Sequence, residues 1–151
     1  MQIVYGPDRD GEFHPLAVAA LEYAGAWLDT NGPAIYATRS LPRWSDMTTP
    51  EVRYTRTKDN STIFATYLSF DFGRFAQESH TLGCLGGNVT DVALLGYTAP
   101  DTRKEIPIGF KTGPAGVIVM VPLGDLAALR QLPAPAYSFR IRGAVWSEER
   151  C

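Results

Sequence analysis

The sequence lacks any long uninterrupted run of apolar residues. No such run within the 151 residues reaches roughly 18, the length that a membrane-spanning helix requires. We therefore expect no spanning helix and no membrane partner. Residues 1–15 also lack the basic start and apolar centre of a secretory signal, which leads us to expect a cytoplasmic protein.

The sequence also lacks a large excess of either charge. Its formal net charge is −2 at pH 7, and its isoelectric point is near 5.6. Nucleic acids and anionic membrane surfaces are usually bound through basic patches, so this balance argues against both as partners. Hydrophobic residues make up 45% of the chain and charged residues 20%, which is enough to bury a core. The length suits one domain, or one domain with a small appendage.

Cysteine and histidine are both scarce. The two cysteines are Cys84 and Cys151, and the two histidines are His14 and His80. Neither cysteine belongs to a closely spaced pair, so a zinc site built from neighbouring ligands is not expected. We expect neither a metal nor another cofactor. A disulfide is possible on paper, but Cys151 is the last residue, and we interpret the pair as one buried thiol and one thiol on the tail.

One segment, residues 15–30, is predicted to be a helix. Its apolar side chains recur at steps of three and four residues, which is typical of a helical face. Pro15 suits the first turn because its missing N–H would be unpaired there in any case. Asn31 and Gly32 both tolerate the left-handed conformation that commonly ends a helix. Residues 3–5 form a short strand candidate, so the N-terminal part is predicted to be a strand, a loop and a helix.

From about residue 51 the pattern changes to short β runs separated by turn signals. The predicted strands are residues 52–57, 62–70, 79–85, 89–95, 106–110, 117–121 and 137–146. This spacing favours a sandwich of antiparallel strands. The predicted fold class is therefore mainly β, an antiparallel β-sandwich preceded by a strand–loop–helix unit.

The last predicted strand alternates cleanly between apolar and polar side chains. The apolar set is Tyr137, Phe139 and Ile141, and the polar set is Ser138, Arg140 and Arg142. Successive side chains of a strand point to opposite faces of the sheet. The pattern therefore predicts a strand with one buried face and one face in water.

Glu78 and His80 are the candidates for a catalytic pair. Alternation along a strand would place both side chains on the same face, where they can form a hydrogen bond. No nucleophile stands nearby in the sequence. A pair of solvent-exposed polar residues is therefore the simpler interpretation of this segment.

Two tryptophans are candidates for binding a sugar. The flat rings of Trp44 and Trp146 match the apolar faces of pyranosides, but tryptophans more commonly pack in a core or an interface. Asn60 and Asn88 each begin a triplet, Asn-Ser-Thr and Asn-Val-Thr, that fits the pattern for N-glycosylation. Because no signal peptide is seen, we interpret both asparagines as hairpin residues.

A series of short motifs runs along the chain in a defined order. They are "NGPAIYATRS" at 31–40, "VRYTRTKDNSTIFATYLSF" at 52–70, "VTDVALLGY" at 89–97, "GVIVMVP" at 116–122 and "AYSFRI" at 136–141. In this order they resemble the C-terminal part of the α-L-fucosidases of glycoside hydrolase family 29. The resemblance implies that residues 1–45 are the remnant of the last β/α unit of a (β/α)₈ barrel with a connecting strap. Residues 46–151 would then be the C-terminal β-sandwich domain.

The resemblance also has consequences for activity. Family members are retaining glycosidases, which need two carboxylates about 5–5.5 Å apart. Both carboxylates belong to earlier barrel segments, and a whole barrel takes about 250 residues. No catalytic residue is therefore carried over to this chain, and whether it is an enzyme stays open.

The function that the resemblance implies is a non-catalytic, structural one. The chain would stabilise or complete a catalytic barrel, or self-associate. The expected partners are a second copy or a missing barrel chain, with fucose-containing glycans as possible ligands. This reading predicts an exposed apolar patch on the helix between Leu16 and Leu28, and a buried strap at residues 34–37. Two alternatives stay open: a free-standing carbohydrate-binding module, and a small hydrolase with a newly recruited site.

Overall fold

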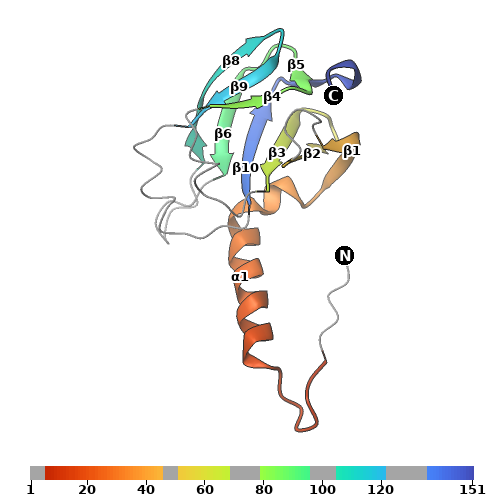
Figure 1. Ribbon diagram of the computed structural model, residues 1–151, viewed down its shortest axis with the longest axis vertical. Coiled ribbons are helices and arrows are strands. Elements are labelled where there is room, and N and C mark those ends of the chain that lie inside the picture. Colours follow the sequence, from red (N-terminus) through yellow and green to blue (C-terminus); the bar gives the residue numbers. More distant parts are fainter. Residues whose placement is uncertain (1–5, 46–50, 69–78, 96–104, 122–135) are drawn as a thin grey trace.

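The computed structural model describes residues 6–45, 51–68, 79–95, 105–121 and 136–151. These residues form a β-sandwich and one long helix, α1, that extends away from it (Figure 1). All of the strand pairs in these ranges are antiparallel. The predicted fold class is confirmed, while the predicted strand at residues 3–5 lies outside the described residues.

The larger sheet has six strands in the order β1-β2-β3-β10-β6-β7. They are β1 (Thr38–Ser45), β2 (Val52–Thr57), β3 (Thr62–Tyr67), β10 (Tyr137–Arg142), β6 (Asp91–Leu95) and β7 (Ile106–Pro107). β10 therefore lies in the interior of the sheet, between β3 and β6, although it comes last of the six in the chain. Its register pairs Tyr137 with Tyr67 at one end and Arg142 with Thr62 at the other.

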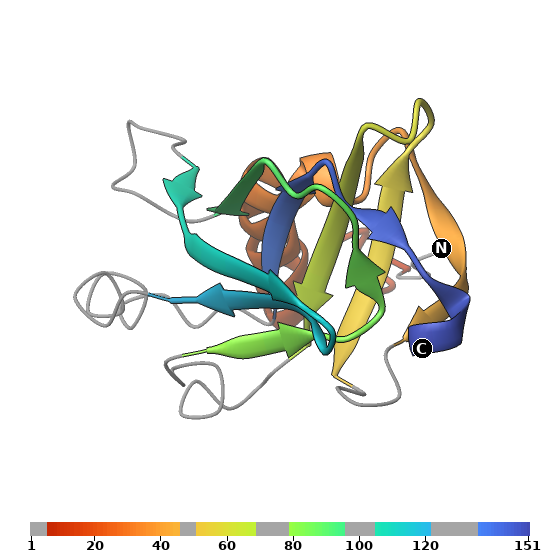
Figure 2. The same ribbon diagram turned by 90° about the horizontal axis from the view of Figure 1, so that it is seen from above.

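A second layer packs on the inner face of this sheet (Figure 2). It contains three strands in the order β4-β9-β8, with bounds β4 (His80–Leu82), β9 (Gly116–Met120) and β8 (Gly109–Gly113). A separate pair joins β5 (Leu85–Gly86) to β11 (Val145–Trp146). The main core lies between the layers, and its fully enclosed side chains include Tyr54, Leu82, Val119, Phe139 and Ile141.

Helix α1 (Pro15–Asn31) matches the predicted segment to within one residue. At its start, the Nδ1 atom of His14 accepts a hydrogen bond from the Leu16 N–H at 3.2 Å. Its end differs from the prediction, because Gly32 has φ −50° and does not adopt the left-handed conformation. The chain instead continues into a 3₁₀ turn, η1 (Gly32–Ala34). Pro33, whose ring holds φ near −65°, suits this continued right-handed turn.

The C-terminal end of α1 and the turn η1 lie on the outer face of the six-stranded sheet. The Trp27 indole N–H donates to the Ala136 carbonyl at 2.8 Å, and the Thr55 hydroxyl donates to the Ala34 carbonyl at 2.6 Å. Ala34 also packs with Phe64 and Leu95 in a small second core. The rest of α1 projects away from the sandwich (Figure 1).

Two predictions for the sheet are wrong. Ser138 and Arg140 were expected on a wet face, but both are buried. The reason is that β10 is an interior strand whose outer face is covered, and the Ser138 hydroxyl bonds to that of Thr66 at 3.0 Å. Residues 38–45, for which no strand was predicted, form β1 and pair with β2. The division into residues 1–45 and 46–151 otherwise stays a prediction.

Within the described ranges, no helix has both the length and the apolar character needed to cross a membrane.

Candidate functional site

His80, the predicted catalytic histidine, lies in the main core. His80 is only 6% exposed, and it is paired with Val119 between strands β4 and β9. The centroid of its ring lies 5.1 Å from that of Tyr67 and 6.2 Å from that of Phe139. His80 is therefore not the solvent-exposed residue that the simpler interpretation expects. Glu78 lies outside the described residues, so the proposed Glu78–His80 pair stays a prediction.

The two candidate sugar-binding tryptophans are on different strands. Trp44 lies in the edge strand β1, but its side chain is outside the described part of the chain. Trp146 lies in β11, with its ring edge-on to that of Tyr54 at a centroid distance of 5.1 Å. Its indole nitrogen is buried and has no hydrogen-bond partner. Trp146 thus packs at the margin of the core, and a role in sugar binding stays a prediction for both residues.

The interpretation of Cys84 and Cys151 as separate thiols is wrong. They form a disulfide with a Cα–Cα distance of 4.7 Å. After β11 the chain turns back through a short 3₁₀ helix, η2 (Glu148–Arg150), and the Ser147 N–H donates to the Cys84 carbonyl at 3.0 Å. This return of the tail places the last residue against a buried position that lies 67 residues earlier.

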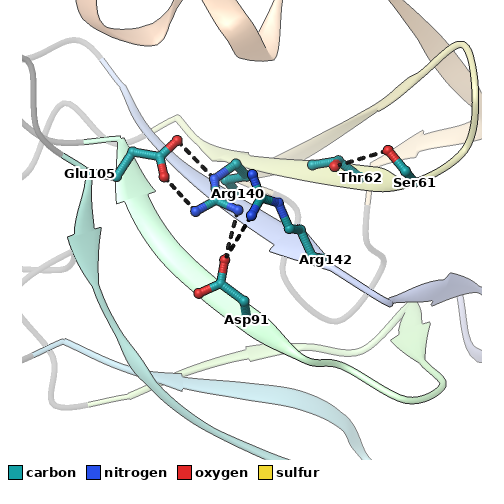
Figure 3. Close-up of polar contacts among 6 residues, drawn as sticks. All are labelled: Ser61, Thr62, Asp91, Glu105, Arg140 and Arg142. Atoms are coloured by element: carbon teal, nitrogen blue, oxygen red, sulfur yellow. Dashed lines mark hydrogen bonds and ion pairs between the residues drawn. The ribbon is translucent and has the colours of Figure 1, made fainter.

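Arg140 is at the centre of a charged cluster that the sequence analysis did not predict (Figure 3). Its Nε donates to Oε1 of Glu105 at 2.8 Å, and Nη1 donates to Oδ2 of Asp91 at 2.7 Å. A second bond joins Nη2 to the other oxygen of Glu105. Arg142 lies at the rim, with Nη1 4.0 Å from Oδ2 of Asp91.

The electrostatics of this cluster indicate a structural network of ion pairs between Arg140, Asp91 and Glu105. Burial disfavours the charge on Arg140, but hydrogen bonds and Coulomb attraction from Glu105 and Asp91 outweigh it and raise the pKa of Arg140. The guanidinium therefore stays charged, and both carboxylates are occupied by it. The sequence carried no signal for this arrangement, because it depends on the register of β6 against β10.

Metal binding finds no support in the described ranges. No three histidine, cysteine, aspartate or glutamate side chains within them are close enough together to hold an ion. Because part of the chain is outside those ranges, the expected absence of a metal or other cofactor stays a prediction.

Helix α1 carries the most distinctive surface of the described residues. Of its 17 residues, only Ala17 and Asn31 are buried. Its only charged residues are Glu22 and Asp29, which are two turns apart and therefore lie on the same side of the helix. We define the α1 surface as five exposed apolar side chains on the helix and the strap that follows it: Leu16 (74% exposed), Leu21 (44%), Tyr23 (45%), Ile35 (45%) and Tyr36 (61%).

Large apolar side chains at this exposure are unusual along a helix. A helix that is apolar on most sides is normally enclosed by other parts of a protein, and a contiguous exposed apolar patch commonly marks an interaction surface. Leu16, Leu21 and Tyr23 lie within the segment where the patch was predicted, whereas Ile35 and Tyr36 lie beyond it. The strap is less buried than predicted, because only Ala34 of residues 34–37 is enclosed.

The known proteins that this chain is similar to are α-L-fucosidases. The chain is 31% identical over 117 residues to the plasma α-L-fucosidase of Rattus norvegicus, a match that covers 78% of this chain and 24% of the relative. It is 32% identical over 142 residues to an α-L-fucosidase of Branchiostoma floridae, covering 93% of this chain and 28% of the relative. The chain resembles the C-terminal part of α-L-fucosidases. No family model matches it.

Solved structures of α-L-fucosidases contain a region with the same fold as this chain. α-L-Fucosidase isoenzyme 1 from Paenibacillus thiaminolyticus superposes with a TM-score of 0.66 at 21% identity, over 91% of this chain and 29% of that structure. At that identity the likeness concerns the fold alone. The chain spans about a quarter of the length of the curated α-L-fucosidases that it matches.

Proposed function

We propose that this chain is the non-catalytic C-terminal portion of an α-L-fucosidase, and that it holds the catalytic portion through the α1 surface. The observation that carries the proposal is the exposure of large apolar side chains in the first half of the helix, from Leu16 to Tyr23. It is supported by the α-L-fucosidases that the chain resembles, because the matched segment makes up only 24% and 28% of their length.

The stability of the helix supports a missing partner. An isolated helix of about 15 residues is marginal in water, and most helices in proteins depend on packing of their apolar face. Within the described residues, α1 is anchored to the sandwich near its C-terminal end, through Trp27 and the turn that follows. Most of its apolar length is left for a partner to cover.

The charged groups of the described residues give little support to independent catalysis. A retaining glycosidase needs a free pair of carboxylates, whereas Asp91 and Glu105 are both bound to Arg140. His80 is enclosed by aromatic rings. Neither alternative function, a sugar-binding module or a small hydrolase, has an observation of its own in these ranges.

A chimera tests the proposal directly. In the Branchiostoma floridae α-L-fucosidase, the matched segment of 142 residues is replaced by the corresponding residues of this chain. We expect the purified chimera to hydrolyse an aryl α-L-fucoside, and this chain alone to be inactive. Hydrolysis by the chain alone, surviving rigorous purification, would overturn the proposal.

Two matched substitutions in the chimera test the α1 surface. Leu16→Glu places a charge in the proposed interface, where an unpaired buried charge costs several kcal/mol, so the yield of active enzyme should fall about tenfold or more. Ala26→Glu adds the same charge at an exposed position, four residues after Glu22 and three before Asp29, beside the charged side chains of the helix, and should leave the yield unchanged. Equal yields from the two variants would contradict the assignment of this face.

A further inference from the structure

Asn60 and Asn88, which begin the two Asn-x-Thr triplets, both lie on exposed turns. Asn60 is in the turn between β2 and β3, and Asn88 is in the turn between β5 and β6. Triplets of this kind are acceptors of N-linked oligosaccharides in secreted proteins, where they occupy surface loops. Exposure is necessary for such a role, because the folded protein must leave room for a bulky, hydrated group.

Neither carboxamide is needed to build its turn. Within the described part of the chain, the side chains of Asn60 and Asn88 make no hydrogen bond. The side-chain bonds of the β2–β3 turn involve Asp59 and Thr57. Oδ1 of Asp59 accepts from the Ser61 N–H at 3.1 Å and the Ser61 hydroxyl at 3.0 Å, and the Thr57 hydroxyl oxygen accepts from the Thr62 N–H at 3.2 Å. Asn60 does have φ +61°, but glycine would meet that backbone requirement equally well. The hairpin interpretation therefore leaves both carboxamides unexplained.

Both asparagines lie at the same end of the six-stranded sheet. Thr62, which starts β3, and Asp91, which starts β6, are both paired with Arg142. The turns that precede them are therefore neighbours at that end, where Figure 2 shows the β2–β3 hairpin protruding. Figure 3 places Ser61 and Thr62 at the base of this turn, on the same end as Arg142.

The Trp27 contact of helix α1 lies toward the other end of these strands, whereas the strap after the helix meets the sheet nearer the hairpin, where Thr38 pairs with Thr57. Trp27 bonds to Ala136, which precedes Tyr137, and Tyr137 pairs with Tyr67 at the far end of β3. Six residues of strand separate the two ends, roughly 17–20 Å at about 3.3 Å per residue. Groups attached at Asn60 and Asn88 would thus extend from the end of the sheet opposite the Trp27 contact.

The disulfide provides a second, independent observation. Disulfides persist in oxidising environments such as the secretory pathway, and they are rare in the cytosol. N-linked transfer belongs to the same pathway. The Cys84–Cys151 bond and the two exposed triplets therefore point to one compartment, which differs from the cytoplasmic location expected from the N-terminal residues.

We propose that Asn60 and Asn88 are N-glycosylation sites, on a chain that folds in an oxidising secretory compartment. The carboxamide nitrogen of each asparagine forms a bond to the anomeric carbon of an oligosaccharide carried by a polyprenyl diphosphate. The bond from that carbon to the diphosphate oxygen breaks, the diphosphate leaves with the electron pair, and the amide releases one proton. Cys84 and Cys151 lose two protons and two electrons to a disulfide-bonded oxidoreductase of the compartment. This proposal does not depend on a fucosidase role.

The test uses the full chain, directed by a cleavable secretory leader in cultured eukaryotic cells. The secreted product is treated with peptide N-glycosidase in heavy-oxygen water and analysed by peptide mass spectrometry. We expect Asn60 and Asn88 both to be converted to labelled aspartate, and a non-reducing digest to join the Cys84 and Cys151 peptides. Transfer precedes folding, so any chain retained in the cells is read in the same way.

Matched variants separate the two sites. Asn60→Gln and Asn88→Gln should each remove one oligosaccharide, whereas Ser61→Ala and Thr90→Ser keep their triplets intact and should keep both. An unlabelled asparagine at either position overturns the proposal for that site. Free thiols at Cys84 and Cys151 in the secreted product overturn the argument for the compartment.

Discussion

The β-sandwich and helix α1 differ in how far their large apolar side chains are buried. In the sandwich, residues such as Phe139 and Leu94 are at most 1% exposed, and β3 is buried along its whole length. On α1, Leu16 is 74% exposed. Because burial of apolar surface is the main favourable term in folding, the sandwich accounts for its own stability and the helix does not. The comparison teaches that the sandwich encloses its own apolar side chains, whereas the helix leaves large apolar side chains exposed.

The anchoring of α1 sharpens this contrast. Its C-terminal end is held by a hydrogen bond from Trp27 and by the packing of Ala34 on Phe64. The apolar side chains nearer its start, such as Leu16, stay exposed. The sandwich thus positions one end of the helix and leaves the other end exposed.

The largest expected difference between the two regions comes from removing an aromatic ring in the core. Phe139→Ala should lower the free energy of unfolding by about 3–5 kcal/mol, because it leaves a cavity between the layers. The matched change Leu16→Ala on the helix should alter it by no more than about 0.5 kcal/mol, since that side chain is already in water. Urea unfolding of the isolated chain measures both. A comparable loss in the two variants would break the comparison.

The disulfide is the next largest contribution within the sandwich. It closes a loop with a sequence separation of 67, and Cys151→Ser should therefore lower the free energy of unfolding by about 4 kcal/mol through the greater entropy of the unfolded chain. Urea unfolding with and without a thiol reductant measures the effect. The reductant should destabilise the wild type and leave the variant unchanged. A wild type insensitive to the reductant would contradict this account.

The Arg140 cluster should contribute less. Asp91 and Glu105 have side chains that are 40% and 45% exposed, so water can replace much of the interaction when the guanidinium is removed. We expect Arg140→Met to cost about 1–3 kcal/mol, less than for a fully buried pair. Arg142→Met, at the exposed rim, should cost no more than about 1 kcal/mol. Unfolding free energies measured at low and high salt separate the two, and equal losses would show that the enclosed arginine has no special role.

The smallest expected effect is at the β2–β3 turn and depends on pH. Hydrogen bonds from Thr57 and Ser61 lower the pKa of Asp59 below its ordinary value of 3.8. A depressed pKa stabilises the folded state above pH 3.8, and that contribution is lost as the pH falls through the folded value. The urea midpoint of Asp59→Ala should therefore lie slightly below that of the wild type at pH 6, and the gap should narrow as the pH falls below 3.8. A gap independent of pH would mean that the charge plays no part.

Local pattern was enough to predict several elements. The segment 52–57 coincides with β2, and the helix was placed to within one residue of α1. These elements are encoded by periodicity and by turn residues that act over a few positions. The candidate surface on α1 was also predicted, although from a family resemblance and not from the helix pattern alone.

Other features depended on parts of the chain that lie far apart in sequence. β1 was missed because residues 38–45 have no clear alternation, and pairing with β2 makes them a strand. Arg140 was expected in water because it alternates with apolar side chains. Its burial depends on neighbours in the sheet that are distant in the sequence. Of the catalytic candidates, His80 could be placed only by the packing of β4 against Tyr67 and Phe139.

The sequence by itself determined the class of fold, the helix and most strands, because these follow from side-chain periodicity over short segments. It also contained both Asn-x-Thr triplets. Only the tertiary structure decided that Cys84 meets Cys151 and that Arg140 is enclosed by two carboxylates. The physical reason is that each of these depends on strand order and register, which bring together residues tens of positions apart. The local sequence pattern does not predict which strands pair or in which register.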